Sequence, residues 1–230
     1  MISVLLITYN RLDMLHRAVE SFLSQDYQDK ELILIDNGST VEQDGTRVVD
    51  FYGKELQRQH ASVSFYHMDY NSIHDAYHLA LDFARGDTCV IMHDDDYFSG
   101  PDSLSKYAAY FDANPDIDVA YCSVFNLTEG NLIEFYPGDP DLKRLMKSDY
   151  FHFPSMAFRK DVIKDVGWIE DDIIYQIDYD WKLRCLMYAR VGWIKDKTYI
   201  YVRHPGQDGN KMTREIMERE NKIIFKRLGI

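Results

Sequence analysis

The stretch Thr88-Cys-Val-Ile-Met-His-Asp-Asp-Asp-Tyr-Phe98 joins an apolar run to three adjacent carboxylates. Residues 89–92 are apolar and predict a buried strand, and the carboxylates of residues 94–96 follow soon after its end. Anions packed this closely repel one another and raise one another's pKa, so a cation or a strong set of hydrogen-bond donors must compensate them. The stretch therefore predicts a strand that ends at a cation-binding or donor-rich site.

Asp94, Asp95 and Asp96, which we call the acidic turn, have the ligand chemistry of a Mg²⁺ or Mn²⁺ site. Both ions prefer carboxylate oxygens, and Mg²⁺ usually completes its shell with water and substrate phosphates. This interpretation predicts that Mn²⁺ or Mg²⁺ holds a phosphorylated ligand at the strand end. The alternative is a solvated acidic turn ahead of a helix that begins at Pro101.

The composition is that of an ordinary globular chain. Its 230 residues are 46% hydrophobic and 14% aromatic, enough to bury the core of one large domain. The formal net charge of −12 opposes binding to nucleic acid. The first residues lack the basic region of a signal peptide, and no apolar run approaches the roughly 20 residues that span a bilayer. Isolated cysteines fit a reducing compartment, so we expect a cytoplasmic protein.

Apolar runs and helical spacings alternate along the first half of the chain. Strands are expected at residues 2–8, 31–36 and 63–67, and helices at residues 12–23, 45–60 and 73–84. A crossover of this length implies parallel strands, and open parallel sheets bind ligands beyond the carboxyl ends of their strands. The turns Thr8-Tyr9-Asn10 and Asp36-Asn37 are therefore expected side by side at one edge. Ordinary turn chemistry is the alternative for each.

The second half of the chain is less regular. Further elements are expected as a helix at 101–113, strands at 118–125, 156–158 and 198–204, and helices at 161–166, 178–188 and 211–230. Residues 126–150 are rich in Gly, Pro and Asp, and a flexible segment over the site would fit them.

Two acids open the helix that starts at residue 178. Helical spacing predicts that Asp180 forms a surface pair with Arg184, four residues later. Asp178 shares a face with Trp181 and Cys185 and is expected to point inward. Asp178 is then a candidate general base, and the alternative is a carboxylate that only stabilises the helix N-terminus.

Several segments, taken in order, resemble the family 2 glycosyltransferases of GT-A fold. They are residues 4–11 (Val-Leu-Leu-Ile-Thr-Tyr-Asn-Arg), residues 32–40, Asn71 with the helix that leads to Arg85-Gly86-Asp87, the acidic turn, and residues 178–184. The resemblance covers residues 1 to about 204. It implies one Rossmann-like α/β domain over residues 1–230, with a central, mostly parallel mixed sheet flanked by helices. Residues up to about 100 would bind the nucleotide-sugar, residues 101–210 the acceptor, and residues 211–230 would form a C-terminal helix.

The resemblance also implies roles for individual residues. The donor nucleotide-sugar would be bound by Thr8, Tyr9, Asn10, Arg11, Asp36, Asn37, Asn71 and Asp94. Metal ligands would be Asp95, Asp96 and His204, and the metal would be Mn²⁺ or Mg²⁺. Asp178 would take the proton of the acceptor hydroxyl. With one base and no carboxylate nucleophile, the reaction would be a single displacement with inversion.

Three positions depart from the usual pattern of the family. His93 stands where its acidic motif commonly begins, which moves the metal towards Asp95 and leaves Asp94 for the ribose. Asn37 replaces a second aspartate in the nucleoside turn, so the nucleobase stays open. Ile177 stands where a glutamate commonly precedes the base.

Two other functions compete with sugar transfer to a hydroxyl of a glycan or lipid-linked acceptor. A sugar-phosphate nucleotidylyltransferase would need a Gly-rich loop near residues 8–12, and none is present. A protein that binds a nucleotide-sugar without catalysis is the second. The basic helix at 211–230 could touch the inner face of a membrane or pack against the core or a partner subunit in a homo-oligomer.

Overall fold

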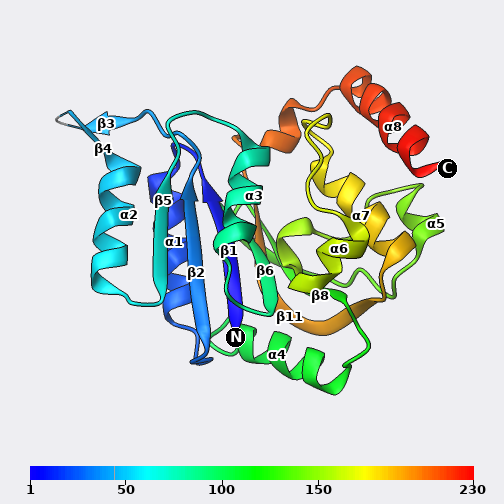
Figure 1. The fold of residues 1–230 in the computed structure, drawn as a ribbon, viewed down its shortest axis with the longest axis horizontal. Helices are drawn as coiled ribbons and strands as arrows, with labels where there is room; N and C mark the ends of the chain where they lie inside the picture. Colours follow the sequence, from blue (N-terminus) through cyan, green and yellow to red (C-terminus); the bar gives the residue numbers. More distant parts are fainter. Residues whose placement is uncertain (44) are drawn as a thin grey trace.

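A nine-stranded sheet organises the structure, a computed structural model that describes residues 1–43 and 45–230. The strands lie in the order β5, β2, β1, β6, β10, β8, β11 and β7, and β9 pairs with β8 (Figure 1). Their bounds are β1 Ile2–Thr8, β2 Lys30–Asp36, β5 Val63–His67, β6 Thr88–His93, β7 Tyr97–Phe98, β8 Val119–Thr128, β9 Asn131–Phe135, β10 Met156–Arg159 and β11 Val191–Arg203. A separate pair consists of β3 Glu42–Gln43 and β4 Thr46–Arg47.

The sheet is mixed and mostly parallel, as the sequence predicted. Strands β5, β2, β1 and β6 are parallel neighbours, and β8 and β11 are parallel to each other. Strand β10 runs antiparallel between β6 and β8 and so joins the two parallel groups. The parallel strands therefore present their carboxyl ends along the same edge of the sheet.

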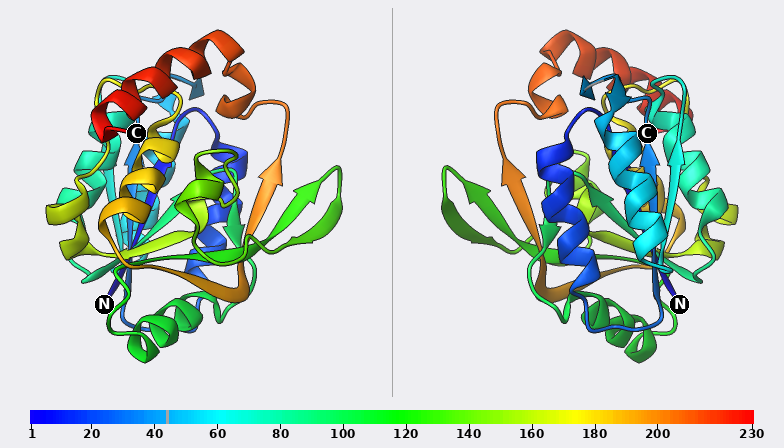
Figure 2. Two further views of the ribbon diagram at one scale, coloured as in Figure 1. Left: turned by 90° about the vertical axis from the view of Figure 1, so that its right-hand side faces the viewer. Right: turned by 90° about the vertical axis from the view of Figure 1, so that its left-hand side faces the viewer.

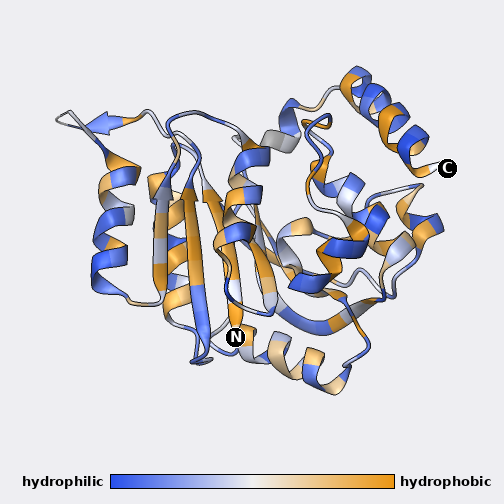
Figure 3. Ribbon diagram, in the orientation of Figure 1, coloured by the Kyte–Doolittle hydropathy of each residue, from blue (hydrophilic) through white to orange (hydrophobic). Residues whose placement is uncertain are grey.

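Helices cover both faces of the sheet. On one face lie α1 Leu12–Leu23, α2 Val48–Gln59 and α4 Ser103–Ala113, and on the other lie α3 Ile73–Phe83, α5 Leu142–Leu145, α6 Ile163–Val166, α7 Ile177–Tyr188 and α8 Arg214–Leu228. Alternate residues of β1 enter the two cores, Val4 and Leu6 on the α1 side and Leu5 and Ile7 on the α3 side. The central strands are apolar over most of their length because both of their faces are covered (Figure 3).

Part of the segment 126–150 is a hairpin, where the sequence suggested a flexible segment over the site. Strand β8 continues to Thr128, and β9 pairs back along it through Glu129 and Gly130, both with positive φ. The hairpin extends away from the body of the molecule (Figure 2), and Leu132 and Ile133 on β9 are exposed. The alternation of apolar and polar residues was too short in this segment to predict a strand.

The C-terminal helix α8 is joined to the start of α7 by a buried carboxylate. The two oxygens of Glu220 accept hydrogen bonds from the backbone N–H groups of residues 174, 175 and 176, at 3.2, 3.1 and 2.9 Å. These groups lie directly before α7, where the helix dipole also favours a negative charge. The position of α7 therefore depends on α8.

The apolar side of α8 packs on the core, one of the two expectations for residues 211–230. Ile224 is fully buried in the same hydrophobic core as Trp181 of α7. Among the described residues, no helix combines the length and the apolar character needed to cross a bilayer. Contact of α8 with a membrane surface stays a prediction.

Replacing Glu220 by Gln tests the link between α8 and α7. The change removes the charge and puts an NH₂ group where an oxygen now accepts hydrogen bonds, so the free energy of unfolding should fall by about 1–3 kcal/mol. Chemical denaturation measures this. Glu218→Gln is the control, because Glu218 is exposed on the same helix and pairs with Arg214. Equal stability of the two variants would show that Glu220 does not fix α7.

Candidate active site

The acidic turn lies where three parallel strands end together. His93, the last residue of β6, pairs with Ile7 of β1, and Thr8 pairs with Asp36 of β2. The expected meeting of the first two turns at one edge is confirmed, and the acidic turn is their neighbour. All three of its carboxylates are buried, which excludes the solvated turn considered above.

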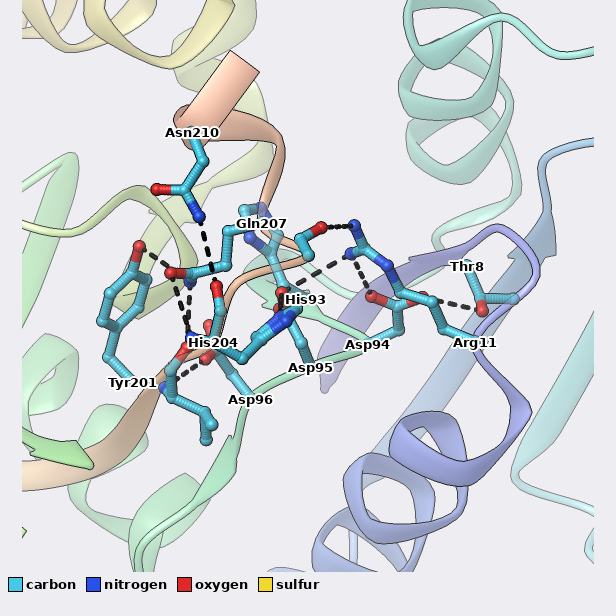
Figure 4. Close-up of polar contacts among 12 residues, drawn as sticks. Thr8, Arg11, His93, Asp94, Asp95, Asp96, Tyr201, His204, Gln207 and Asn210 are labelled. Carbon is cyan, nitrogen blue, oxygen red and sulfur yellow. Dashed lines mark hydrogen bonds and ion pairs between the residues drawn. The ribbon is translucent and has the colours of Figure 1, made fainter. Parts of the chain in front are cut away.

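Asp94 is held by residues of the first turn. Its carboxylate accepts hydrogen bonds from Thr8 Oγ1 at 2.9 Å and from Arg11 Nη1 at 3.2 Å (Figure 4). Burial raises the pKa of Asp94, and the neighbouring Arg11 only partly opposes the rise. The turn after β1 therefore supplies the side-chain donors to Asp94.

Asp95 is joined to the loop after β11. His204 Nε2 lies 2.9 Å from Asp95 Oδ2, and Arg11 Nη1 lies 3.5 Å from the same oxygen. Arg11 also donates to the carbonyl of Gly206, at 3.0 Å. Residues nearly 200 positions apart in the chain thus meet at one carboxylate.

The loop that carries His204 is fixed by amide side chains. Gln207 Nε2 donates to Tyr201 Oη at 3.1 Å and to the carbonyl of Val202 at 2.9 Å, and Asn210 Nδ2 donates to the carbonyl of His204 at 3.2 Å (Figure 4). Gln207 and Asn210 were not singled out from the sequence. They hold the backbone of this loop, and so help to hold the imidazole next to Asp95.

Asp96 has the environment expected of a metal ligand. Its Oδ1 accepts a hydrogen bond from the N–H of Val202 at 2.7 Å, while its Oδ2 is buried and has no partner among the described residues. Burial, and next the charge of Asp95, raise the pKa of Asp96 well above its ordinary value. A buried anionic oxygen without a partner is costly unless a cation binds it.

The donor set near that oxygen fits a divalent cation. Ligand atoms of His93, Asp95 and Asp96 lie within 4.8 Å of one another and could together hold a metal ion. His93 was not among the predicted ligands, although its position in place of the usual first acid was a visible signal. Its Nε2 also lies 3.2 Å from Tyr77 Oη of α3.

The turns after β1 and β2 form one interlocked unit. Asn10 has a positive φ of 54°, and its side-chain oxygen accepts hydrogen bonds from the N–H groups of Thr40 and Val41, at 2.8 and 3.1 Å. The N–H of Asn10 donates in return to Ser39 Oγ at 2.9 Å. Asn10 thus holds the turn after β1 against the turn after β2. Tyr9 is exposed and makes no hydrogen bond to a described residue.

Asp36 is fully buried and has two fixed partners. Its Oδ1 accepts a hydrogen bond from the N–H of Ser39 at 3.0 Å, and its Oδ2 lies 2.7 Å from His67 Nδ1 at the end of β5. The turn needs glycine at position 38, because φ is +77° and a Cβ would lie 2.6 Å from the backbone of Tyr70. His67 is a further polar residue at this edge that the sequence did not single out.

Asn37 and Asn71 connect this turn to the start of α3. Asn37 Oδ1 accepts a hydrogen bond from the N–H of Ser72 at 2.8 Å, and Asn71 Nδ2 donates to the carbonyl of Asn37 at 3.2 Å. Both side chains therefore shape the edge of the sheet. Their expected contact with a nucleoside stays a prediction.

Asp178 of α7 lies near Tyr77 of α3, as Asp94 and Asp95 of the acidic turn do. Burial raises the pKa of Tyr77, and the carboxylates of Asp178, Asp94 and Asp95 add to the rise. Tyr77 is thus close to both, although Asp178 makes no hydrogen bond to the acidic turn. The Asp178 side chain is 35% exposed and sits in the first turn of α7.

The expected pair of Asp180 with Arg184 is present, but its expected place at the surface and the inward direction expected of Asp178 were wrong. Asp180 is buried and accepts two hydrogen bonds from Arg184, at 2.9 and 2.7 Å, and one from Arg227 of α8, at 3.2 Å. Asp178 is the more exposed of the two. Helical spacing failed because α7 is buried on nearly every side between residues 179 and 185, so no apolar stripe marks its inner face.

Comparison with known proteins identifies the family. The model of glycosyl transferase family 2 matches residues 3–167, more than half of the chain. An uncharacterized glycosyltransferase of Methanocaldococcus jannaschii is 27% identical over 218 residues, which cover 90% of this chain and 72% of that protein.

Two solved structures have the same fold. Residues 1–349 of S. aureus TarS, in complex with UDP-GlcNAc, match with a TM-score of 0.73 and 17% identity over 95% of this chain and 64% of that one. The mannosyltransferase PcManGT from Pyrobaculum calidifontis, in complex with GDP-Man and Mn²⁺, matches with a TM-score of 0.68 and 18% identity over 99% of this chain and 63% of that one. The chain spans less than two thirds of either structure.

These likenesses confirm the GT-A fold that the resemblance implied. The chain belongs to the family 2 glycosyltransferases.

Proposed function

We propose that this glycosyltransferase moves a sugar from a nucleotide-diphosphate sugar to a hydroxyl of a glycan or lipid-linked acceptor, with inversion and with a divalent cation. The observation that carries the proposal is the unpartnered, buried Oδ2 of Asp96 beside His93 and Asp95. This oxygen lies at the edge of the sheet where the two interlocked turns follow β1 and β2.

The donor would lie along the edge formed by β1, β2 and β6, in the part of the chain up to about residue 100. Thr8, Asn10, Asp36, Asn37 and Asn71 would shape the nucleoside subsite, with Tyr9 as an exposed ring at its rim. Arg11 bridges Asp94 and Asp95 and would meet phosphate oxygens as well. Asp94 would face the ribose.

A cation held by Asp95, Asp96 and either His93 or His204 would neutralise the diphosphate as it leaves. Mn²⁺ and Mg²⁺ both suit this set of oxygen and imidazole ligands. The Mn²⁺ bound by PcManGT and the UDP-GlcNAc bound by TarS support a cation and a nucleotide-sugar here.

Asp178 would act as the general base for the acceptor. The acceptor oxygen forms a bond to the anomeric carbon while its proton passes to Asp178. The bond from that carbon to the diphosphate oxygen breaks, and its electron pair leaves with the diphosphate. Attack from the face opposite to the leaving group inverts the anomeric centre.

Residues 101–210 would bind the acceptor, since they provide α7 and the segments around it. A cytoplasmic location, contact with the inner face of a membrane and a homo-oligomeric state remain predictions.

Removal of the cation tests the donor site. UDP or GDP with Mn²⁺ should raise the melting temperature by several degrees, because a ligand at about 100 times its Kd stabilises the folded state by about 2.7 kcal/mol. EDTA should abolish most of that rise. Uridine and guanosine, which lack the diphosphate, are the controls. A rise that is unchanged by EDTA would contradict cation-dependent binding.

Replacing Asp178 by Asn tests the assignment of the base. Transfer of sugar from a radiolabelled donor should fall by about 10²–10⁴-fold, the usual contribution of a general base, while nucleotide binding persists. Asp165→Asn is the matched control, because Asp165 is an exposed acid in the first turn of α6. Equal activity of both variants would leave Asp178 with only a role in helix stability.

A further inference from the structure

The ammonium group of Lys182 is buried and pairs with Asp178. The side chain of Lys182 is only 1% exposed, and its Nζ donates to Asp178 Oδ2 at 3.1 Å and to Asp149 Oδ2 at 2.5 Å. A third hydrogen bond goes to the carbonyl of Phe151, at 3.3 Å. All three donors of the ammonium group therefore have partners.

Burying an ammonium group is costly, so its partners must offset the cost. Burial alone would lower the pKa of Lys182, but the carboxylates of Asp149 and Asp178 outweigh it and raise the pKa above the ordinary value. Lys182 is therefore charged at neutral pH. Leucine or methionine would fill the same volume without this requirement, so packing alone does not explain a lysine at this position.

Asp149 belongs to a different segment from Asp178, in the loop that follows α5. Burial raises the pKa of Asp149, the charge of Lys182 opposes the rise, and the charge of Asp178 adds to it. Lys182 thus joins the acid on α7 to a loop of the proposed acceptor half.

The geometry leaves one oxygen of Asp178 available. Its Oδ2 is held by Lys182, while its Oδ1 makes no hydrogen bond to a described residue, and the side chain is 35% exposed. A carboxylate fixed through one oxygen keeps the other in a defined direction. This is the arrangement that a positioned base needs.

We propose that Lys182 and Asp149 are positioning residues for the transfer reaction, in which Lys182 holds the Asp178 carboxylate towards the acceptor and Asp149 holds Lys182. This inference rests on the proposed function of Asp178 as the base. It assigns to Lys182 a role that neither the helix nor the hydrophobic core requires.

Other titratable groups near Asp178 are Tyr77 of α3 and His152, in addition to Asp149 and Lys182. Burial, followed by the charge of Lys182, lowers the pKa of His152 to about 3, so His152 stays neutral above that pH. Burial raises the pKa of Tyr77, which keeps its hydroxyl protonated. Lys182 is therefore the charged group that pairs directly with Asp178, and Asp149 pairs with Lys182 in turn.

The two positioning residues have opposite charges, and this separates their effects. Lys182→Met should lower kcat by about 10- to 100-fold with little change in the KM for the donor, because the base loses its orientation. The acid limb of the pH–rate profile should move to higher pH, because a positive charge is lost beside Asp178. Asp149→Asn removes a negative charge and should move the same limb down.

Lys106→Met is the matched control. Lys106 also pairs with an aspartate four residues earlier on a helix, Asp102, at 2.8 Å, but it lies on α4. It should leave kcat and the pH profile unchanged.

A second readout needs no substrate. The ¹³C signal of the Asp178 carboxyl group, identified by its loss in Asp178→Asn, can be titrated by NMR in the intact protein. Its midpoint should rise in Lys182→Met and fall in Asp149→Asn relative to the unchanged chain. Asp149 is partly exposed, so Asp149→Asn tests the inference even if Lys182→Met does not fold.

The outcomes distinguish this inference from the proposed function. Opposite shifts of the midpoint, together with a loss of kcat in Lys182→Met, support it. Unshifted midpoints, or shifts in the same direction, overturn it whether or not transfer is observed. If Asp178→Asn retains full transfer while the midpoints shift in opposite directions, the proposed base is wrong and the ion pairs only set the charge of a carboxylate.

Discussion

Mutual repulsion among the carboxylates of the acidic turn is the constraint on which the site depends. Asp94, Asp95 and Asp96 are buried together at the end of β6, and burial raises the pKa of two of them. Arg11 compensates part of this charge, and His204 Nε2 lies 2.9 Å from Asp95 Oδ2. Asp96 Oδ2 is left without a partner among the described residues, and a divalent cation shared with a diphosphate would complete the compensation.

The rest of the fold brings distant segments to that point and fixes them there. Parallel strands align the first two turns with the acidic turn, and the loop after β11 returns His204 to Asp95. The helix that carries Asp178 is held in three ways. Glu220 binds the backbone at its start, Asp180 pairs with Arg184 and Arg227, and Lys182 joins it to Asp149. The buried polar groups of α7 thus fix the position of this helix as well as stabilise the fold.

Much of this could be predicted from local sequence patterns. The strand over residues 2–8 was expected with its observed bounds, because buried parallel strands are continuous apolar runs. The meeting of the turns after β1 and β2 was expected because these strands were predicted to be parallel. The orientations of Asp178 and Asp180 could not be predicted correctly, because a helix buried on nearly every side has no polar face to orient it. Lys182, His67 and Gln207 were not singled out, since their partners lie more than 30 residues away or in a loop without a repeat.

The claim that a divalent cation compensates the charge of the acidic turn is tested most directly by anomalous scattering. The crystal would be grown with Mn²⁺ and a nucleoside diphosphate. The account predicts a peak bonded to Asp96 Oδ2, with Asp95 and the diphosphate in the same coordination shell. A nucleotide bound at the strand ends with no peak there, and with Asp94 and Asp95 still joined to Arg11, would contradict it.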